Sequence, residues 1–442
     1  MLILGLGSNV GDSLNNLRLA VQLLQKSQVI TRLQISPLYS SSALLPPYAP
    51  AVWNKPYLNI ALSCKTELPP MEVLAVVKQI EKQMGREESQ RWAPRLIDID
   101  ILAWDDLILN EARLQIPHAE LGRRPFALWP LLDLLPKWKH PYHEIADLVE
   151  CWGSRFLGQA PFNTKQLSQR LLGTQLVGIL NVTPDSFSDG GQFINVSDAL
   201  VQAEKLMLEG AEILDIGAES TRPGAQPLLP ENEWQRLAPV LNAINDHSKT
   251  WPVKPTLSVD TRHYQVAEKA IELGVDWIND VSGFSDSKMR GLVVKTAVKC
   301  VVMHNLGVPA NKNNVMSGYS DICEPILNWG KQRFNELTLA GVDPGQFIFD
   351  IGIGFGKTAQ QSAYLLKNIK QFQRLGFPLL VGHSRKSFLN VITDRPFSER
   401  DFETALFSYQ LALQGVNYLR IHNVGLSTRA LKCVCYMEEN YL

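Results

Sequence analysis

The stretch Leu176-Val177-Gly178-Ile179-Leu180-Asn181 decides the fold of the larger part of this chain. It is a short apolar run that ends in a polar residue, and from residue 174 onward such runs alternate eight times with amphipathic helical segments. The predicted strands are residues 176–181, 213–217, 256–260, 277–280, 300–304, 347–351, 379–382 and 418–422. Eight β/α units predict a closed (β/α)8 TIM barrel over residues 174–442, with its chemistry where strands end and loops begin.

Residues 1–153 lack this regular rhythm. The predicted elements are strands at residues 2–6, 36–39, 57–64 and 96–103 and helices at residues 12–26 and 71–84. The first helix places Leu14, Leu17, Val21 and Leu24 on one face, at spacings of three and four. This irregular mixture predicts a compact α+β sandwich as a first domain.

Composition limits what the two domains can bind. The 442 residues are 45% apolar and 20% charged with a net charge of -1, which is a globular composition without a bulk positive field. We therefore expect neither nucleic acid nor a membrane surface as a partner. The polar residues 154–173 predict a linker between the domains. We see no signal peptide and no apolar stretch of about 18 residues, and we expect a cytoplasmic protein.

The cysteines give little evidence for disulfides or metal. There are six in a long chain, at positions Cys64, Cys151, Cys300, Cys323, Cys433 and Cys435. Such scattered positions are not typical of a disulfide scaffold. The Cys-x-Cys pair near the carboxyl terminus has no other candidate metal ligands close to it in the sequence, so free thiols are the simpler interpretation.

Polar residues gather at the ends of seven of the eight predicted barrel strands. Any one of them could be structural or solvated, but the set as a whole indicates a site. Donors and acceptors suited to a flat polar heterocycle are Asp260, Asn279, Asp350 and Lys386. Candidates for binding anions are Thr221, Arg222, Arg420 and His422. Arg420 and His422 are two apart on a strand, so both face one side, where Asn181 could add Mg2+ to stabilise a departing diphosphate.

One glycine-rich run resembles a phosphate-binding loop but fails its spacing. Gly352, Gly354 and Gly356 precede Lys357 and Thr358. A true loop needs a further glycine five positions before the Gly of Gly-Lys-Thr, and that position is Ile351. We therefore expect no nucleotide at this run.

Three long motifs in the barrel carry a family resemblance. They are Asn181-Val-Thr-Pro-Asp-Ser-Phe-Ser-Asp-Gly-Gly, Glu219-Ser-Thr-Arg-Pro-Gly-Ala and Ser384-Arg-Lys-Ser. Through them residues 174–436 resemble dihydropteroate synthase, a family that condenses 6-hydroxymethyl-7,8-dihydropterin diphosphate with p-aminobenzoate. The resemblance implies one Mg2+ at Asn181 and a possible homodimer through the barrel. It also implies two mobile loops, at residues 183–191 and 221–226.

The resemblance implies a role for each matching residue of the barrel. The pterin ligands would be Asp260, Asn279, Asp350, Phe355 and Lys386. The catalytic residues would be Asn181, Lys386, Arg420 and His422. The residues near p-aminobenzoate and the diphosphate would be Phe187, Thr221, Arg222, Pro223, Ser384, Arg420 and His422. The implied reaction is a dissociative substitution, in which diphosphate leaves before the weakly basic arylamine attacks.

In the first domain the strongest feature is Asp98-x-Asp100 on a predicted strand. Residues two apart on a strand face one side, so the two carboxylates could hold Mg2+ that is bound to nucleotide phosphates. Arg86, Arg91 and Arg95 lie just upstream and could neutralise phosphate charge. An Asp-x-Asp pair alone is a weak signal, and the three arginines strengthen it.

Residues 1–141 resemble hydroxymethyldihydropterin pyrophosphokinase, which implies a ferredoxin-like fold, ATP as a substrate and two Mg2+ ions. The matching pieces include Gly7-Ser8-Asn9, Arg91-Trp92-x-Pro94-Arg95, Asp98-x-Asp100 and Ile116-Pro117-His118. The implied catalytic residues are Arg86, Arg95, Asp98 and Asp100, the last two also as metal ligands. The implied ATP ligands are Glu81, Arg91, Trp92, His118 and Arg124. The implied pterin ligands are Tyr57, Asn59 and Phe126.

The chain departs from that family at three places. Lys78 occupies a position near ATP where glutamine is usual, and the loop at residues 85–92 is one residue short, with Glu87 and Glu88 in place of basic side chains. The loop at residues 40–56 is long. These departures bear on the rate of the first reaction and on loop motion.

The combined prediction is a bifunctional enzyme whose first product is its second substrate. An alternative is a pterin-dependent methyltransferase, which shares the barrel and a similar pterin site. Thr221-Arg-Pro, Ser384-Arg-Lys and Arg420-x-His422 argue against it, as does the lack of a cobalamin-binding segment. A second alternative makes the first domain a non-catalytic support. We expect no aldolase ahead of the first strand.

Overall fold

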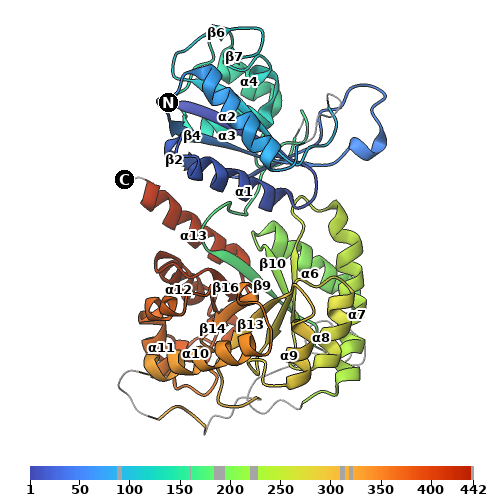
Figure 1. The fold of residues 1–442 in the computed structure, drawn as a ribbon, viewed down its shortest axis with the longest axis vertical. Coiled ribbons are helices and arrows are strands. Elements are labelled where there is room, and N and C mark those ends of the chain that lie inside the picture. The colour runs from blue at the N-terminus through green and yellow to red at the C-terminus, as the bar shows by residue number, and fades with distance from the viewer. Residues whose placement is uncertain are drawn as a thin grey trace. The chain divides into compact units, whose positions relative to one another are not determined.

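The computed structural model describes residues 1–86, 92–159, 161–183, 195–219, 227–308, 314–317 and 322–439, with residues 434–439 described by their backbone alone. The chain forms two compact units, Met1–Leu172 and Gly173–Leu442 (Figure 1). Each unit has its own sheet and its own hydrophobic core.

The first unit is built on a six-stranded antiparallel sheet. Its strands are β1 (Leu2–Ser8), β2 (Thr31–Ile35), β3 (Tyr39–Ser41), β4 (Tyr57–Lys65), β5 (Asp98–Trp104) and β8 (Lys165–Gln166). They run in the order β5-β1-β4-β3-β8, and β2 also pairs with β4. A separate ribbon consists of β6 (Leu109–Asn110) and β7 (Gln115–Ile116). The order β5-β1-β4 with β2 and β3 beyond is the split βαβ arrangement, which confirms the ferredoxin-like prediction.

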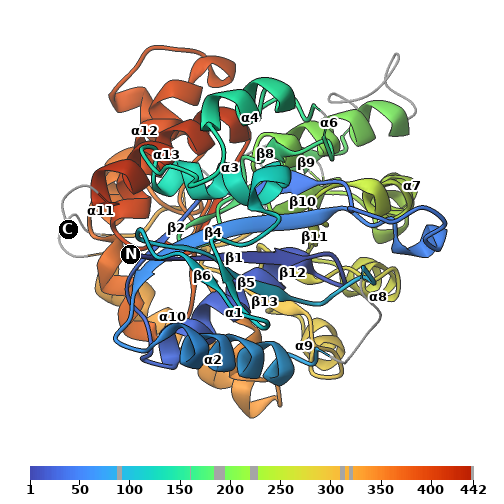
Figure 2. The same ribbon diagram turned by 90° about the horizontal axis from the view of Figure 1, so that it is seen from above.

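Helices cover both faces of this sheet, as Figure 2 shows. On one face lie α1 (Ser13–Lys26) and α2 (Pro70–Gln83), and on the other lie α3 (Pro125–Leu134) and α4 (Ile145–Trp152). The Asp12 side chain caps α1 by accepting the Asn15 N–H at 3.0 Å, which satisfies a backbone donor of the first turn. The rings of Trp129 in α3 and Trp152 in α4 meet edge to face with centroids 5.9 Å apart.

The strand predicted at residues 36–39 is wrong in its placement. The structure ends β2 at Ile35 and begins β3 at Tyr39, and both strands pair with β4. Pro37 lies in the gap, and because it has no N–H it cannot continue the ladder. Ser36 bridges the interruption: its hydroxyl accepts the Ala61 N–H at 2.9 Å.

The segment predicted as a linker, residues 154–173, also differs from that expectation. It carries β8, which pairs with β3, so nearly all of it belongs to the first unit. Arg155 forms an ion pair with Asp133 of α3, and the Tyr39 hydroxyl donates to the same carboxylate at 2.5 Å. These contacts come from residues far apart in sequence, and the polar composition of the segment does not reveal them.

The second unit is a closed barrel of eight parallel strands, as predicted. The strands are β9 (Gln175–Asn181), β10 (Ile213–Gly217), β11 (Thr256–Asp260), β12 (Trp277–Asp280), β13 (Lys299–Met303), β14 (Phe347–Asp350), β15 (Leu379–Val381) and β16 (Tyr418–Ile421). The helices are α6 (Val196–Leu208), α7 (Pro230–His247), α8 (Tyr264–Glu272), α9 (Ser287–Val293), α10 (Cys323–Leu339), α11 (Ala359–Lys367), α12 (Asp401–Leu413) and α13 (Val424–Glu439). β16 pairs with β9 and closes the barrel.

Apolar side chains fill the lower part of the barrel. They are Val177, Ile213, Trp277, Val301, Ile348 and Leu380, with Tyr418 packed against them. The rings of Trp277 and Tyr418 meet edge to face at 4.9 Å. Within the part of the chain that the structure describes, no helix has the length and apolar character needed to cross a bilayer.

The placement of residues 154–172 in the first unit predicts that point mutations there affect stability. Leu167 is buried, and its N–H donates to the Leu38 carbonyl, whereas Leu172 is exposed. We expect Leu167→Ala to lower the free energy of unfolding by about 2–3 kcal/mol, because it deletes a buried side chain. Leu172→Ala should change it by less than about 0.5 kcal/mol. Scanning calorimetry of the full chain measures both variants, and equal small effects would restore the linker interpretation.

Candidate active sites

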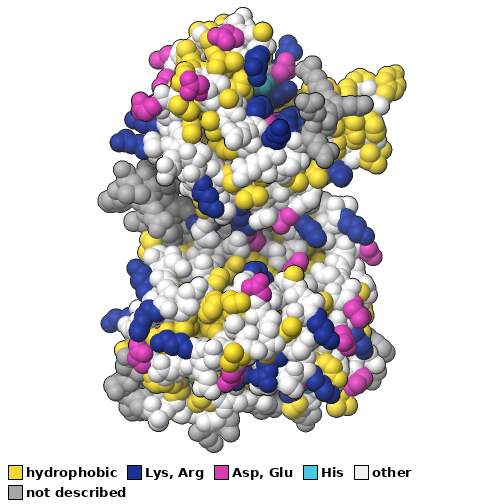
Figure 3. Space-filling model, viewed as in Figure 1, with side chains coloured by type: hydrophobic (Ala, Val, Ile, Leu, Met, Phe, Trp, Pro, Cys, Tyr) yellow, Lys and Arg dark blue, Asp and Glu magenta, His cyan; other side chains and the backbone are white. Residues whose placement is uncertain are grey.

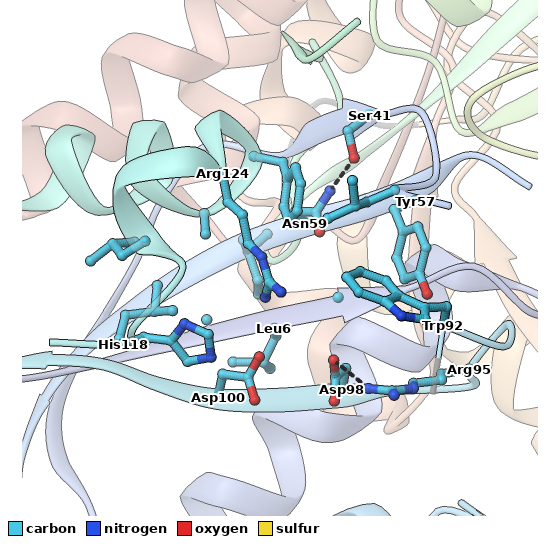
Figure 4. A pocket seen from close by; sticks show the side chains of 18 of the residues that line it. Leu6, Ser41, Tyr57, Asn59, Trp92, Arg95, Asp98, Asp100, His118 and Arg124 are labelled. Atoms are coloured by element: carbon cyan, nitrogen blue, oxygen red, sulfur yellow. Dashed lines mark hydrogen bonds and ion pairs between the residues drawn. The ribbon is translucent and has the colours of Figure 1, made fainter. Parts of the chain in front are cut away.

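Two carboxylates of the first unit face one cavity. Asp98 and Asp100 are two apart on β5, so both side chains leave the same face of the strand. Figure 4 shows them side by side, with His118 and Arg124 near Asp100 and with Arg95 beside Asp98. The cavity has a volume of about 280 Å³, and both carboxylates line it.

Two guanidinium groups hold Asp98. Arg86 Nη1 donates to its Oδ1 at 2.8 Å, and Arg95 Nη1 donates to its Oδ2 at 2.9 Å. Burial alone would raise the pKa of Asp98, but the cations of Arg95, Arg86 and Lys78 lower it below its ordinary value. Arg95 is itself fixed through its backbone, because its N–H donates to Asn9 Oδ1 at 2.7 Å. Asp98 is therefore ionised and oriented.

Asp100 lies in a different electrostatic environment. Burial and the adjacent charge of Asp98 raise its pKa, and His118 and Arg124 oppose that rise. Burial lowers the pKa of His118, and its Nδ1 accepts the Glu120 N–H at 3.2 Å, so the neutral ring carries its proton on Nε2. The Arg124 Nε is buried and has no hydrogen-bond partner among the described residues. A cation near Asp100 would stabilise its charged form.

The other side of the cavity presents aromatic and amide groups. Tyr57, Asn59, Trp92 and Phe126 all line it, and Figure 4 shows Trp92 beside Tyr57. The buried Asn59 donates through Nδ2 to Ser41 Oγ at 3.0 Å, which fixes the amide plane. A flat ring can stack on the aromatics while an oriented amide contacts its edge.

Two side chains of α2 differ in how they meet the prediction: Lys78 lies at the cavity, as expected, and Glu81 does not line it. Glu81 is buried behind the cavity, where its Oε1 accepts the Ile99 N–H at 2.7 Å and forms an ion pair with Arg86. It orients these groups and is not among the described residues that line the cavity. Lys78 does line the cavity, and its Nζ donates to Glu81 Oε1 at 3.0 Å. Figure 3 shows Lys and Arg side chains gathered beside a histidine on one face of the first unit.

In the barrel, a polar layer lies directly above the apolar one. Asp215, Asn279, Asp350 and Arg420 each follow an inward apolar residue of the core by two positions, the first of them Ile213. Side chains two apart on a strand share a face, so these four also point into the barrel. The predicted residues Asn279, Asp350 and Arg420 are thus brought together.

Arg420 is the centre of this layer. Its Nε donates to Asp215 Oδ2 at 2.5 Å, and its Nη2 donates to Asp260 Oδ2 at 2.7 Å. Asp215 also accepts from Asn279 Nδ2 at 3.0 Å and from Ser258 Oγ at 2.5 Å. Burial alone would lower the pKa of Arg420, but Asp215 and Asp260 raise it. Burial raises the pKa of Asp260 although Arg420 opposes this.

Asp350, Phe355 and Lys386 form a second cluster. The Lys386 Nζ donates to the Ile353 carbonyl and lies 4.8 Å from the centre of the Phe355 ring. Burial lowers the pKa of Lys386 to about 8, and the charge of Asp350 opposes that shift. Burial raises the pKa of Asp350, and its Oδ1 accepts the Gly352 N–H at 2.7 Å. An amine and a carboxylate with perturbed pKa values thus lie beside an aromatic ring.

Of the remaining predicted residues, some lie in the described part of the chain and others lie outside it. His422 follows β16, and its Nδ1 lies 2.9 Å from Ser384 Oγ, so these two are together. Asn181 is the last residue of β9. Five predicted residues lie outside the described part of the chain: Arg91, Phe187, Thr221, Arg222 and Pro223. The two loops predicted at residues 183–191 and 221–226 fall there as well, except for Thr183.

The sequence analysis missed Asp215 and Ser41. Asp215 is in the middle of β10, whereas the predicted site residues lie toward strand ends and in the loops that follow. A signal was present, because an Asp inside an otherwise apolar barrel strand must face either the barrel interior or a helix, and both are costly for an unpaired charge. Ser41 gave no comparable signal, since its contact with Asn59 depends on the pairing of β3 with β4.

Comparison with known families assigns a class to each unit. Residues 3–136 match the family of 7,8-dihydro-6-hydroxymethylpterin pyrophosphokinases, and residues 177–422 match the pterin binding enzymes. The barrel is similar to a dihydropteroate synthase from Anaplasma phagocytophilum, solved with 6-hydroxymethylpterin-monophosphate (37% identity, TM-score 0.55, 60% of this chain and 100% of that one). It is also similar to the enzyme from Xanthomonas albilineans, solved with 4-aminobenzoic acid (31%, 0.55, 60% and 93%).

Full-length relatives carry the same two units in one chain. The folate synthesis bifunctional protein of Chlamydia caviae is 36% identical over 446 residues, which cover 98% of this chain and 97% of that protein. One from Arabidopsis thaliana is 35% identical over 478 residues, which cover 99% and 96%. This chain belongs to the family of bifunctional folate synthesis proteins. Its first unit is a pterin pyrophosphokinase and its barrel is a dihydropteroate synthase, which act in consecutive steps of folate biosynthesis.

The contacts of Asp215 predict a role in the second reaction. Asp215→Asn keeps the shape but removes the charge that orients Arg420. We expect the rate of dihydropteroate formation to fall roughly ten- to a hundredfold, because a charge-assisted bond of about 1.5–3 kcal/mol is weakened. Asp276→Asn is the control, since Asp276 accepts the Leu257 N–H at the opposite end of the barrel. A normal rate for Asp215→Asn, measured with supplied pterin diphosphate, would contradict this role.

Proposed function

We propose that Asp98 and Asp100 hold two Mg2+ ions bound to the phosphates of ATP, while Arg86 and Arg95 stabilise the diphosphate as it passes to 6-hydroxymethyl-7,8-dihydropterin. The observation that carries this proposal is the pair of neighbouring carboxylates facing one cavity beside two guanidinium groups. Charge of both signs in one enclosed place suits an anion that arrives with a divalent cation.

The residues present fit Mg2+ by their chemistry. Carboxylate oxygens are the ligands it prefers, and it commonly takes one or two from protein and the rest from phosphates and water. Among the described residues no group of three or more carboxylate, imidazole and thiol side chains forms a complete metal cage. Two carboxylates in an open cavity match a Mg2+ site that takes one or two ligands from the protein and the rest from phosphates and water. The ions would neutralise phosphate charge. Their positive charge would also lower the raised pKa of Asp100.

The lining of the cavity supports separate places for the two substrates. His118, Arg124 and Trp92 would contact ATP, as would Arg91. Tyr57, Asn59 and Phe126 would hold the pterin ring. Asn59 is oriented by Ser41 and therefore presents a fixed hydrogen-bonding edge. Glu81 supports the site from behind, through Lys78 and Arg86.

In the barrel we infer that Asp260, Asn279, Asp350, Phe355 and Lys386 hold the pterin. The supporting observation is the buried polar layer, whose donors and acceptors come from five strands and from the loops after β14 and β15. Arg420, His422 and one Mg2+ at Asn181 would receive the diphosphate. The p-aminobenzoate would lie near Ser384 and the residues Phe187, Thr221, Arg222 and Pro223.

These side chains support a substitution at the pterin methylene. The bond from carbon to the diphosphate oxygen breaks, and the electron pair leaves with the oxygen. Positive groups at Arg420 and His422 lower the cost of that charge. The lone pair of the arylamine then forms the carbon–nitrogen bond, and the nitrogen loses a proton to give dihydropteroate. The aromatic ring of Phe355 and the carboxylates beside the pterin stabilise the cationic pterin that precedes attack.

We also propose a homodimer through the barrel and a cytoplasmic location. The dimer is supported by α12, where Phe402 is 66% exposed and Leu406 is 54% exposed, because a single large apolar side chain is common on a surface but neighbouring ones indicate a contact. Light scattering of the full chain tests it. Some relatives are named as mitochondrial, such as a second protein of Arabidopsis thaliana, so the location needs its own measurement.

A one-pot assay separates the two proposed sites. The mixture contains ATP, Mg2+, 6-hydroxymethyl-7,8-dihydropterin and p-aminobenzoate, and AMP and dihydropteroate are followed separately. We expect Asp98→Ala to lower both products by about a hundredfold or more, because the second reaction lacks its substrate. Arg420→Ala should lower dihydropteroate alone by a similar factor.

Two exposed residues provide matched controls, Asp106→Ala for the first change and Arg395→Ala for the second. Supplied pterin diphosphate should restore dihydropteroate formation in Asp98→Ala but not in Arg420→Ala. If the unchanged protein forms no AMP, yet makes dihydropteroate from supplied pterin diphosphate, the first unit is a scaffold and its site assignments are wrong.

A further inference from the structure

The loop that follows β14 holds a buried lysine to which neither reaction assigns a role. Lys357 lies in the glycine-rich run that fails the spacing of a phosphate loop, and its side chain is 7% exposed. A buried lysine is uncommon in proteins, because its desolvation is costly unless its donors are satisfied. Along the chain it follows the polar layer's Asp350 by seven residues and Phe355 by two.

Three acceptors surround the Lys357 amine. Its Nζ lies 2.9 Å from His304 Nδ1, 2.9 Å from the Gly352 carbonyl and 2.9 Å from the Phe355 carbonyl. An ammonium has three N–H donors and no acceptor, so the three contacts satisfy it completely. Burial lowers the pKa of Lys357 to about 7, and the charge of Asp350 opposes that shift.

These contacts join the end of one strand to the turn that follows another. His304 directly follows β13, whereas Gly352 and Phe355 lie after β14 and are themselves joined by a backbone hydrogen bond of 3.0 Å. The turn is held tightly against His304: a side chain at Gly352 would place its Cβ 1.9 Å from the His304 carbonyl oxygen. Lys357 therefore fastens a turn that has little room to shift.

The same turn carries groups of the pterin site. Phe355 presents its ring to Lys386, and Ile353 accepts a hydrogen bond from Lys386 through its carbonyl. The N–H of Gly352 donates to Asp350. Each of these three groups depends on the backbone path between Ile351 and Lys357. Losing the Lys357 contacts would therefore change the positions of Phe355 and Lys386 in the pterin site.

We propose that Lys357 is a positioning residue for the pterin site of the barrel, acting through the Gly352 and Phe355 carbonyls and His304. The proposal rests on the assignment of Asp350, Phe355 and Lys386 to the pterin. Lys357 itself touches no reacting atom. Its effect is on how well the turn is set before the substrate arrives, and so on binding of the pterin more than of the arylamine.

The test is steady-state kinetics of Lys357→Met with supplied pterin diphosphate. Methionine keeps much of the volume and apolar length of the side chain but removes every donor. We expect KM for the pterin diphosphate to rise about tenfold, which corresponds to the loss of one good hydrogen bond to the substrate. KM for p-aminobenzoate should stay within about twofold, and AMP formation by the first unit should be unchanged.

Gln346→Met is the matched control for a purely structural loss. Gln346 immediately precedes β14, at the other end of the barrel, and its Nε2 donates to the carbonyls of Val293, Thr296 and Val298 at 3.3, 3.1 and 2.8 Å. Like Lys357 it is buried and binds backbone carbonyls. We expect this variant to lower the melting temperature without changing KM for the pterin diphosphate.

A second pair of variants applies if Lys357→Met does not fold. His304→Leu removes the third contact but leaves Lys357 with both carbonyls, and a smaller rise in the same KM is expected. The separate variant His304→Asn should have the normal KM, because an asparagine amide oxygen can replace Nδ1 as the acceptor. If His304→Leu and His304→Asn have the same KM as the unchanged protein, the proposal is wrong.

The proposal is also overturned if Lys357→Met raises both KM values equally or behaves as Gln346→Met does. Failure of the site assignment itself gives a different result. If the single replacements of Asp350, Phe355 and Lys386 by alanine leave KM for the pterin diphosphate unchanged, the pterin binds elsewhere and the positioning role has no object. That result is obtained without any change at Lys357, so the two failures are distinguishable.

Discussion

The barrel site depends on the buried pairing of Arg420 with Asp215 and Asp260. The two-residue period of a strand places this polar layer directly above the apolar layer that contains Ile213 and Trp277, so the packed core fixes the height at which the charges lie. A guanidinium has five N–H donors, and these two bonds use only part of them. The same group that holds the layer together can therefore also bind an anion.

The same strand rule acts in the first unit with a different balance of charge. Asp98 and Asp100 share a face of β5, but only Asp98 lies between two guanidinium groups, so the pKa values of the two carboxylates move in opposite directions. The cations of the protein thus fix the charge of Asp98, whereas the charge of Asp100 depends on what enters the cavity. This asymmetry supports the proposal that a metal ion and its nucleotide bind in the cavity together.

The sequence predicted the barrel well because each of its strands is a short buried apolar run whose neighbours in sequence are also its neighbours in space. It predicted β3 and the segment around β8 poorly, because Pro37 interrupts one strand and β8 pairs with a strand more than a hundred residues earlier. Strand-end residues such as Asn279 were found from position alone. Asp215 was missed although it lies inside an apolar strand, and Lys357 was given no role, because their contacts with Arg420 and His304 form only in the closed barrel.

The charges of the barrel layer also indicate which part of the substrate the layer favours. Asp215, Asp260 and Asp350 face Arg420 and Lys386 there, so carboxylates are at least as numerous as cations. Such a layer favours a neutral ring rich in hydrogen-bond donors over a multiply charged anion, and burial keeps the pKa of Asp260 raised. In the proposed arrangement the pterin ring lies within this layer, and the diphosphate lies toward His422 and the remaining donors of Arg420.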